Sequence, residues 1–242
     1  MTARIYGIRA CRGALAPGGA LWVDAASANR RIWHLAAEAK AAGVQVHKTT
    51  KRRLDAACGS GNHQGVVFMS APQPEAAAGL PQVIAKTDKA AIALDGVSDP
   101  QNLGAIVRTA AAFGIGAIVM PRAGSAPMNA AAAKIAGGYA SRVAICRVGN
   151  LRRALKTMTD GGWRTVAVDE SGERSFFDVP LPPPPLCWVF GGEGKGLRPI
   201  VRGACAFSAR LPSVDGDAGC LNVAAAVAGC LTAAQIGLRR RA

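Results

Sequence analysis

The chain has 242 residues, half of them hydrophobic, and 29 Lys and Arg against 15 Asp and Glu give it a formal net charge of +14. Such a large apolar fraction excludes an intrinsically disordered chain and supports a folded core. A basic excess of this size favours polyanionic partners, such as nucleic acid or an anionic membrane surface.

The sequence disfavours a membrane span, a secretory signal and a metal site. No run of about 18 apolar residues lacks a charge or a helix-breaking cluster, so no membrane span is predicted. The segment Met1–Arg12 contains arginines but no continuous apolar stretch, so we expect no secretory signal. Seven scattered cysteines form no Cys-x-x-Cys pair and only three histidines are present, so we predict reduced thiols, a cytoplasmic location and no metal site.

A small α/β domain is predicted over residues 1–70. Three short strands and one helical pattern follow one another there: Ala20–Val23, Arg30–Ala42, Val44–His47 and Gly65–Met69. The domain also carries basic clusters at Arg30-Arg31 and at Lys51-Arg52-Arg53. The segment that follows is rich in proline and alanine and lacks hydrophobic periodicity, so residues 71–84 are predicted to be a linker.

A larger α/β domain is predicted over residues 85–242. Five apolar runs indicate buried strands: Ile92–Leu94, Ala117–Met120, Val143–Val148, Thr165–Val168 and Trp188–Phe190. Four patterns indicate helices, with Asn129 and Asn150 as N-caps: Leu103–Phe113, Asn129–Ala136, Leu151–Met158 and Leu221–Leu238. The alternation predicts a parallel sheet covered on both faces.

Polar groups stand where three of these segments begin or end, and ligands of open α/β sheets bind at the carboxyl ends of the strands. The first such stretch runs from Asp95 to Arg108. Asn102 is predicted to open a helix there, and Arg108 follows six positions later, roughly above the same end of the helix face. A simpler interpretation makes Asn102 a helix cap and Arg108 a solvated cation.

The second stretch, Gly191-Gly-Glu-Gly-Lys-Gly, exposes backbone groups to a ligand. Lys195 is followed by glycine, so this is not a Walker A loop, and the spacing does not match the dinucleotide fingerprint. Glu193 would repel a phosphate, so a cationic ligand suits the loop better. A plain glycine-rich turn remains the alternative.

In the third stretch, Leu211-Pro to Leu221-Asn-Val, the simple interpretation of Asn222 is again helix capping.

Taken together and in this order, the three stretches resemble the three motifs of the SpoU family, the TrmH-like RNA ribose 2′-O-methyltransferases of the SPOUT superfamily. The N-terminal domain is similar as well. Ile5-Tyr-Gly-Ile and His63-Gln-Gly-Val resemble the start and end of the small RNA-binding domain of the branch that methylates a guanosine of 23S ribosomal RNA.

The resemblance implies a deep trefoil knot near the C-terminus, a feature that general topology rules would not predict. It also implies S-adenosylmethionine bound by the knotted loops, and a homodimer with each site near the subunit interface, for which the C-terminal helix is a candidate contact. Polar site residues map to Asn102, Arg108, Glu193 and Asn222. Cofactor binding maps to Gly191, Gly192, Gly196, Leu211 and Leu221.

The chemistry of the ribose hydroxyl leads to a hypothesis for the role of each polar residue. Arg108 would bind the ribose or its phosphate and ease the loss of the hydroxyl proton, because a guanidinium is itself almost never a base. Asn102, Glu193 and Asn222 would orient Arg108 and the substrate.

The third motif departs from the family pattern in two places. Cys220 stands where the family usually has a serine, and a thiol is the weaker hydrogen-bonding group. The stretch Ser213–Gly219 is one residue longer than usual and carries two acids. These departures leave open a non-catalytic RNA-binding or ribosome-assembly protein. A transfer-RNA 2′-O-methyltransferase is a second alternative, which only the N-terminal domain disfavours.

Overall fold

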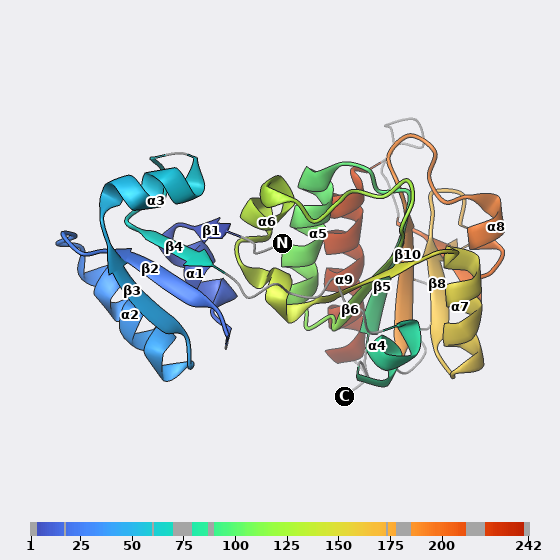
Figure 1. Ribbon diagram of the computed structural model, residues 1–242. Helices are drawn as coiled ribbons and strands as arrows, with labels where there is room; N and C mark the ends of the chain where they lie inside the picture. Colours follow the sequence, from blue (N-terminus) through green and yellow to red (C-terminus); the bar gives the residue numbers. More distant parts are fainter. Residues whose placement is uncertain are drawn as a thin grey trace. The chain divides into compact units, whose positions relative to one another are not determined.

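The structure is a computed structural model that describes residues 4–16, 18–59, 61–69, 79–86, 90–172, 174–177, 185–211 and 221–239 (Figure 1). The chain forms two compact units. The N-terminal unit comprises Met1–Pro74 and Met128–Arg142, and the C-terminal unit comprises Glu75–Pro127 and Val143–Ala242.

The N-terminal unit is built on a four-stranded sheet of order β1-β4-β2-β3. Its strands are β1 (Arg4–Tyr6), β2 (Ala20–Asp24), β3 (Gln45–Thr49) and β4 (Val66–Met69). Only β2 and β3 are parallel. Its first three helices are α1 (Ile8–Ala14), α2 (Arg30–Ala41) and α3 (Lys51–Cys58). Leu21, Val23 and Phe68 share a core with Ile32 and Leu35 of α2.

The three strands and the helix predicted for this region are confirmed. Two of the elements that were not predicted are too short or too polar to show a period. Strand β1 has three residues, and α3 buries Leu54 alone. Periodicity needs several apolar residues in register, so neither element carries that signal.

A segment between two strands of the C-terminal unit packs within the N-terminal unit. It contains α6 (Ala130–Ala136) and the 3-10 helix η1 (Tyr139–Arg142). A Cβ placed on Gly138 would lie 2.0 Å from the carbonyl oxygen of Ala10 in α1, so the two backbones are in close contact. Lys134 lies over the ring of Tyr6, with Nζ 5.8 Å from the ring centroid. The proposed boundaries at residues 1–70, 71–84 and 85–242 assign this segment to the second domain.

The predicted linker overlaps a helix, α4 (Leu80–Lys86), and residues 71–78 lie outside the described residues.

The predicted α/β fold with a parallel sheet is confirmed in the C-terminal unit. Its sheet has seven strands in the order β7-β6-β5-β10-β8-β11-β9, and every strand pair is parallel. The strands are β5 (Ala90–Asp95), β6 (Ala117–Pro121), β7 (Ala144–Val148), β8 (Arg164–Val168), β9 (Arg174–Ser175), β10 (Leu186–Gly191) and β11 (Phe207–Arg210).

Helices cover both faces of this sheet, as predicted. On one face α4, α7 (Leu151–Asp160) and α8 (Pro199–Arg202) share a core with alternate residues of the central strands. On the other face α5 (Pro100–Ala112) and α9 (Val223–Arg239) pack side by side (Figure 1). The trefoil knot stays a prediction. In the described part of the chain, no helix has both the length and the apolar character that a membrane crossing requires.

The N-caps Asn129 and Asn150 are confirmed, since each side chain accepts a hydrogen bond from the first turn of its helix. Helix α5 begins earlier than predicted. Asp99 is its N-cap, with Oδ1 2.8 Å from the backbone nitrogen of Gln101, and Pro100 occupies the first helical position. Asn102 is therefore the third residue of the helix and not its cap. Proline at the first position is compatible with a helix because the N–H that it lacks has no intrahelical partner there.

Candidate active site

The three motifs meet at the carboxyl edge of the seven-stranded sheet. Because all its strands are parallel, β5, β10 and β11 end at this edge, at Asp95, Gly191 and Arg210 respectively. The loop after β10 leads to α8, and α9 begins at Val223. This edge is where ligands of open α/β sheets bind.

The loop after β10 folds back on itself through its glycines. The backbone nitrogen of Gly192 donates to the carbonyl of Asp95 at 2.8 Å, and that of Gly196 donates to the carbonyl of Gly192 at 3.2 Å. A Cβ on Gly191 would lie 2.1 Å from the carbonyl carbon of Gly196, and one on Gly192 would lie 2.1 Å from the oxygen of Gly96. Only glycine permits such an approach of two backbones.

Three of the four predicted polar residues form one hydrogen-bonded chain. The amide nitrogen of Asn102 donates to Oε1 of Glu193, and its Oδ1 accepts from Nδ2 of Asn222 at 3.1 Å. Oδ1 of Asn222 accepts from the backbone nitrogen of Ala224 at 2.9 Å and so also caps α9. These contacts join residues 91 and 120 positions apart in the sequence. Each amide has its orientation fixed by a partner that only donates or only accepts.

Arg108 does not belong to this chain of contacts among the described residues. Its side chain is exposed on α5 and has no hydrogen bond or ion pair within the described part of the structure. Six residues along a helix correspond to about 9 Å of rise and about a third of a turn from Asn102, so the two side chains diverge. The structure thus leaves the Arg108 guanidinium accessible to a polyanion.

An ion pair that was not predicted lies at the same edge of the sheet. The carboxylate of Asp95 is buried, and Arg198 binds it through Nη2 at 2.7 Å and through Nε at 2.9 Å. The backbone nitrogen of Arg198 donates to the same carboxylate at 3.1 Å. These hydrogen bonds raise the pKa of the Arg198 guanidinium. The signal in the sequence was a carboxylate at the end of an otherwise apolar strand, because a buried charge requires a partner.

The residues predicted to bind the cofactor lie at the same edge. Gly191, Gly192 and Gly196 form the glycine loop, Leu211 directly follows β11, and Leu221 precedes α9 by two residues. Cys220 and the stretch Ser213–Gly219 lie outside the described residues, so the departures from the family pattern have no structural account.

Carboxylates are concentrated at this edge. Glu193 and Glu170 are exposed, and no cation pairs with either within the described ranges. Asp169 follows β8 and lies 3.7 Å from Nη1 of Arg202. Among the described residues, no three His, Cys, Asp or Glu side chains come together as a metal site. Glu193 stands on the glycine loop of a protein of net charge +14 and has no cation partner among the described residues, which favours a cationic group on the ligand.

Two family models match the chain. The SpoU rRNA Methylase family matches residues 89–232, and the RNA 2′-O ribose methyltransferase substrate binding family matches residues 4–76. The chain is 34% identical over 213 residues to the 23S rRNA (guanosine-2′-O-)-methyltransferase RlmB of Bordetella pertussis, covering 87% of this chain and 86% of that protein. It is 35% identical to an uncharacterized tRNA/rRNA methyltransferase of Mycobacterium avium, covering 96% of this chain and 74% of that protein.

Solved structures share the fold. An AdoMet-bound rRNA methyltransferase from Sinorhizobium meliloti superposes with a TM-score of 0.76 at 23% identity, covering 98% of this chain and 88% of that one. The SpoU methyltransferase AviRb from Streptomyces viridochromogenes, in complex with AdoMet, superposes with a TM-score of 0.75 at 20% identity, covering 99% of this chain and 90% of that one. The sequence motifs, the two family models and the fold agree, and the chain belongs to the SpoU rRNA methylase family.

Proposed function

We propose that this protein transfers a methyl group from S-adenosylmethionine to a ribose 2′-hydroxyl of RNA, and that the acceptor is a guanosine of 23S ribosomal RNA. The carrying observation is the hydrogen-bonded chain of Asn102, Glu193 and Asn222, which joins the three SpoU motifs at one edge of the sheet. The substrate follows from the relatives named for guanosine 2′-O-methylation of 23S rRNA.

The residues present fit S-adenosylmethionine. This cofactor carries a sulfonium, and the exposed carboxylate of Glu193 stands on the glycine loop. The loop backbone is open to a ligand, because a Cβ on Gly194 would meet no atom within 4 Å among the described residues. Gly191, Gly192, Gly196, Leu211 and Leu221 would hold the cofactor. When bound, it supplies an electrophilic methyl group, so the protein need not generate one.

The side chains of the site orient the acceptor ribose. A ribose hydroxyl has a pKa far above neutral, so it must be positioned and partly deprotonated as it attacks. Arg108 binds the ribose or its phosphate and stabilises the developing negative charge, because a guanidinium donates hydrogen bonds and keeps its charge. Asn102 and Asn222 hold Glu193 in one orientation, and Glu193 orients the substrate.

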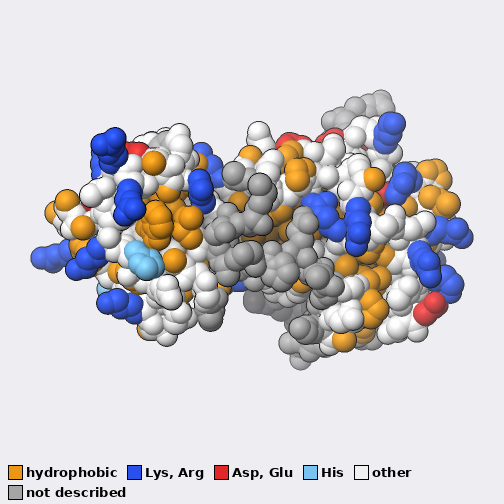
Figure 2. All heavy atoms as spheres, in the orientation of Figure 1, with side chains coloured by type: hydrophobic (Ala, Val, Ile, Leu, Met, Phe, Trp, Pro, Cys, Tyr) orange, Lys and Arg blue, Asp and Glu red, His pale blue; other side chains and the backbone are white. Residues whose placement is uncertain are grey.

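The N-terminal unit binds the RNA substrate in this proposal. Its sequence matches the substrate-binding family model, and its basic clusters at Arg30-Arg31 and Lys51-Arg52-Arg53 are exposed. On the face shown in Figure 2, Lys and Arg side chains are spread over both units and acidic side chains are few. Phosphate contacts of this kind supply much of the affinity of a protein for RNA.

The active form in this proposal is a homodimer. Two apolar side chains near the ends of the C-terminal segment support it, because Leu221 is 53% exposed and Ile236 in α9 is 50% exposed. A helix with exposed large apolar side chains beside its buried face is typical of a subunit contact.

The test is methyl transfer from labelled S-adenosylmethionine to large-subunit ribosomal RNA from a strain that lacks this protein, with the modified nucleotide mapped. One 2′-O-methylated guanosine is the expected result. Transfer to transfer RNA alone would replace the proposed substrate. No transfer to either RNA by a folded protein would favour a non-catalytic RNA-binding or ribosome-assembly role and would direct attention to Cys220 and residues 213–219.

A further inference from the structure

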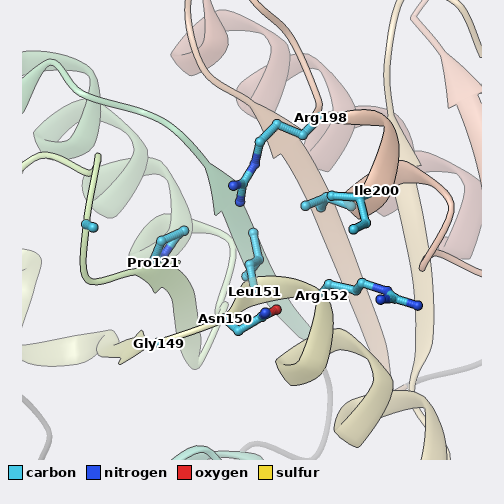
Figure 3. Close-up of a pocket in the computed structure, with 9 residues that line it drawn as sticks. Pro121, Gly149, Asn150, Leu151, Arg152, Arg198 and Ile200 are labelled. Carbon is cyan, nitrogen blue, oxygen red and sulfur yellow. The ribbon is translucent and has the colours of Figure 1, made fainter.

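A cavity of about 300 Å³ lies beside the proposed active site, at the carboxyl ends of β6 and β7 (Figure 3). Three buried apolar residues line it: Pro121 at the end of β6, Leu151 at the start of α7 and Val201 in α8. Ile200, which is 57% exposed, adds an apolar side chain to the lining. None of the four polar residues of the proposed active site lines this cavity.

Arg152 and Arg198 line the cavity, and Arg153 lies next to Arg152 and lines the neighbouring hollow. The buried carboxylate of Asp95 neutralises the charge of Arg198 and fixes its guanidinium, which in Figure 3 extends into the space above Leu151. Arg152 and Arg153 are exposed on α7, and no carboxylate among the described residues pairs with either of them. Their cations are therefore available to an anion.

A second hollow extends the cationic surface. It measures about 240 Å³ and is lined by Asn150, Arg152, Arg153 and Lys156. Lys156 is paired with Asp160 on the same helix at 2.9 Å, in an exposed pair that contributes little to stability. The surface next to the cavity is thus cationic, and the cavity lining contains no acid.

These features match the chemistry of one nucleotide. An apolar floor and a fixed, planar guanidinium suit the face of a nucleobase, since unstacked bases bind arginine planes in this way. Cations without partners suit a phosphate. A small free anion would not contact the apolar floor, and an apolar peptide would not pair with Arg152 and Arg153. A volume of about 300 Å³ suits one nucleoside, since it is at the lower end for small-molecule sites.

We propose that this cavity binds one unpaired nucleotide of the substrate RNA, with its base over Leu151 and Ile200 and its phosphate on Arg152 and Arg153. The proposal rests on the proposed function, which brings RNA to the same edge of the sheet. Asp95 connects the two places. Its side chain holds Arg198 of the cavity, and its carbonyl accepts from Gly192 of the loop that carries Glu193.

The first test replaces both cations, as Arg152→Ala with Arg153→Ala, in the full-length protein. Alanine preserves the helix. The matched control is Arg164→Ala, an exposed arginine at the opposite, amino edge of the sheet. Fluorescence anisotropy with a fluorescein-labelled single-stranded RNA should show an affinity about ten-fold lower for the double variant. The slope of log K against log salt should become less steep by about 0.7, for the one phosphate that the two arginines bind. An affinity and slope equal to those of Arg164→Ala would overturn the proposal.

The second test locates the RNA directly. Single-stranded RNA that contains 4-thiouridine is crosslinked to the wild-type protein by ultraviolet light, and the crosslinked peptides are identified by mass spectrometry. Crosslinks to residues 149–153 or 198–201 are expected, and Ile200→Ala should weaken them without a change in the salt slope. Crosslinks confined to the N-terminal unit would overturn the proposal. Crosslinks at the cavity without methyl transfer by the same protein would support the cavity and contradict the proposed function.

Discussion

The contacts of Asn102 and Asn222 show why single residues were ambiguous in the sequence. Helix capping explained either residue by itself, and Asn222 does cap α9 through its Oδ1. Its amide nitrogen is free for a second partner and donates to Asn102. Asn102 caps nothing, because Asp99 takes that role in α5. An amide has both donors and an acceptor, so one asparagine can stabilise a helix and build a site at once.

Arg108→Ala should lower the rate of methyl transfer about 100-fold, the usual effect of removing one donor that stabilises a developing negative charge. The side chain makes no hydrogen bond or ion pair to the described residues, so folding should be unaffected. Single-turnover kinetics with ribosomal RNA measures the rate, and equilibrium binding of S-adenosylmethionine is the control. A near wild-type rate in a folded variant that binds cofactor would refute the role of Arg108.

Alkylation tests the state of two thiols, of which Cys11 is buried and Cys205 is half-buried. Burial raises the pKa of Cys11 to about 12, and burial together with the charge of Asp95 raises the pKa of Cys205 to about 12. A raised pKa disfavours the thiolate, so at pH 8 about one thiol in ten thousand would be ionised at either position. Iodoacetamide at pH 8 should leave both unlabelled in the folded protein and label both in guanidinium chloride. Mass spectrometry of the peptides gives the result, and rapid labelling of folded Cys11 would contradict it.

The loop after β10 can close only if glycine occupies the position of Gly192. Gly192→Ala should abolish cofactor binding, because its Cβ would lie 2.1 Å from the carbonyl oxygen of Gly96 and the loop could not close. Gly149→Ala is the matched control, since a Cβ at that exposed turn meets no atom within 4 Å among the described residues. Isothermal titration with S-adenosylmethionine measures both. Equal affinities would show that the loop closure is not needed for binding.

The packing of Met128–Arg142 within the N-terminal unit can be tested at Gly138. Gly138→Ala should lower the free energy of unfolding by about 2 kcal/mol or more, because its Cβ would lie 2.0 Å from the oxygen of Ala10. Gly43→Ala separates this contact from backbone strain, since Gly43 also has a positive φ but no atom within 4 Å of the added Cβ among the described residues. Denaturant unfolding of both variants should show the larger loss for Gly138→Ala. Equal losses would mean that the contact contributes nothing.

Which elements the sequence revealed depended on their length and burial. The central strands of the large sheet are buried over nearly their whole length and appeared as continuous apolar runs, as in β5 and β10. Helix α7 showed its apolar face clearly, with Leu151, Leu155 and Met158 buried. Strand β9 has two residues and α8 has four, so neither shows a period. Such short elements form because neighbouring strands and helices pack against them, and not because of a helix or strand preference in their own sequence.

At the scale of the whole molecule, the homodimer is a prediction that α9 can test. Ile236→Glu should shift the protein from dimer to monomer in sedimentation equilibrium, because a carboxylate would replace an exposed apolar side chain in the proposed contact. Gln235→Glu adds the same charge at the adjacent exposed position and is the control. A protein that is monomeric before any substitution, or an Ile236→Glu variant that stays dimeric, would remove α9 from the contact.

Periodicity, caps and motifs are local properties of the chain, so they were sufficient to predict the α/β class, the parallel sheet, the helices N-capped by Asn129 and Asn150, and the family. Which residues meet depends on the tertiary packing. The ion pair of Asp95 with Arg198 and the contact of Asn102 with Asn222 join positions 103 and 120 residues apart. The packing of Met128–Arg142 within the N-terminal unit and the cavity beside α7 likewise bring together segments that are distant in the sequence. No local pattern encodes such approaches, since they arise from the packing of the whole chain.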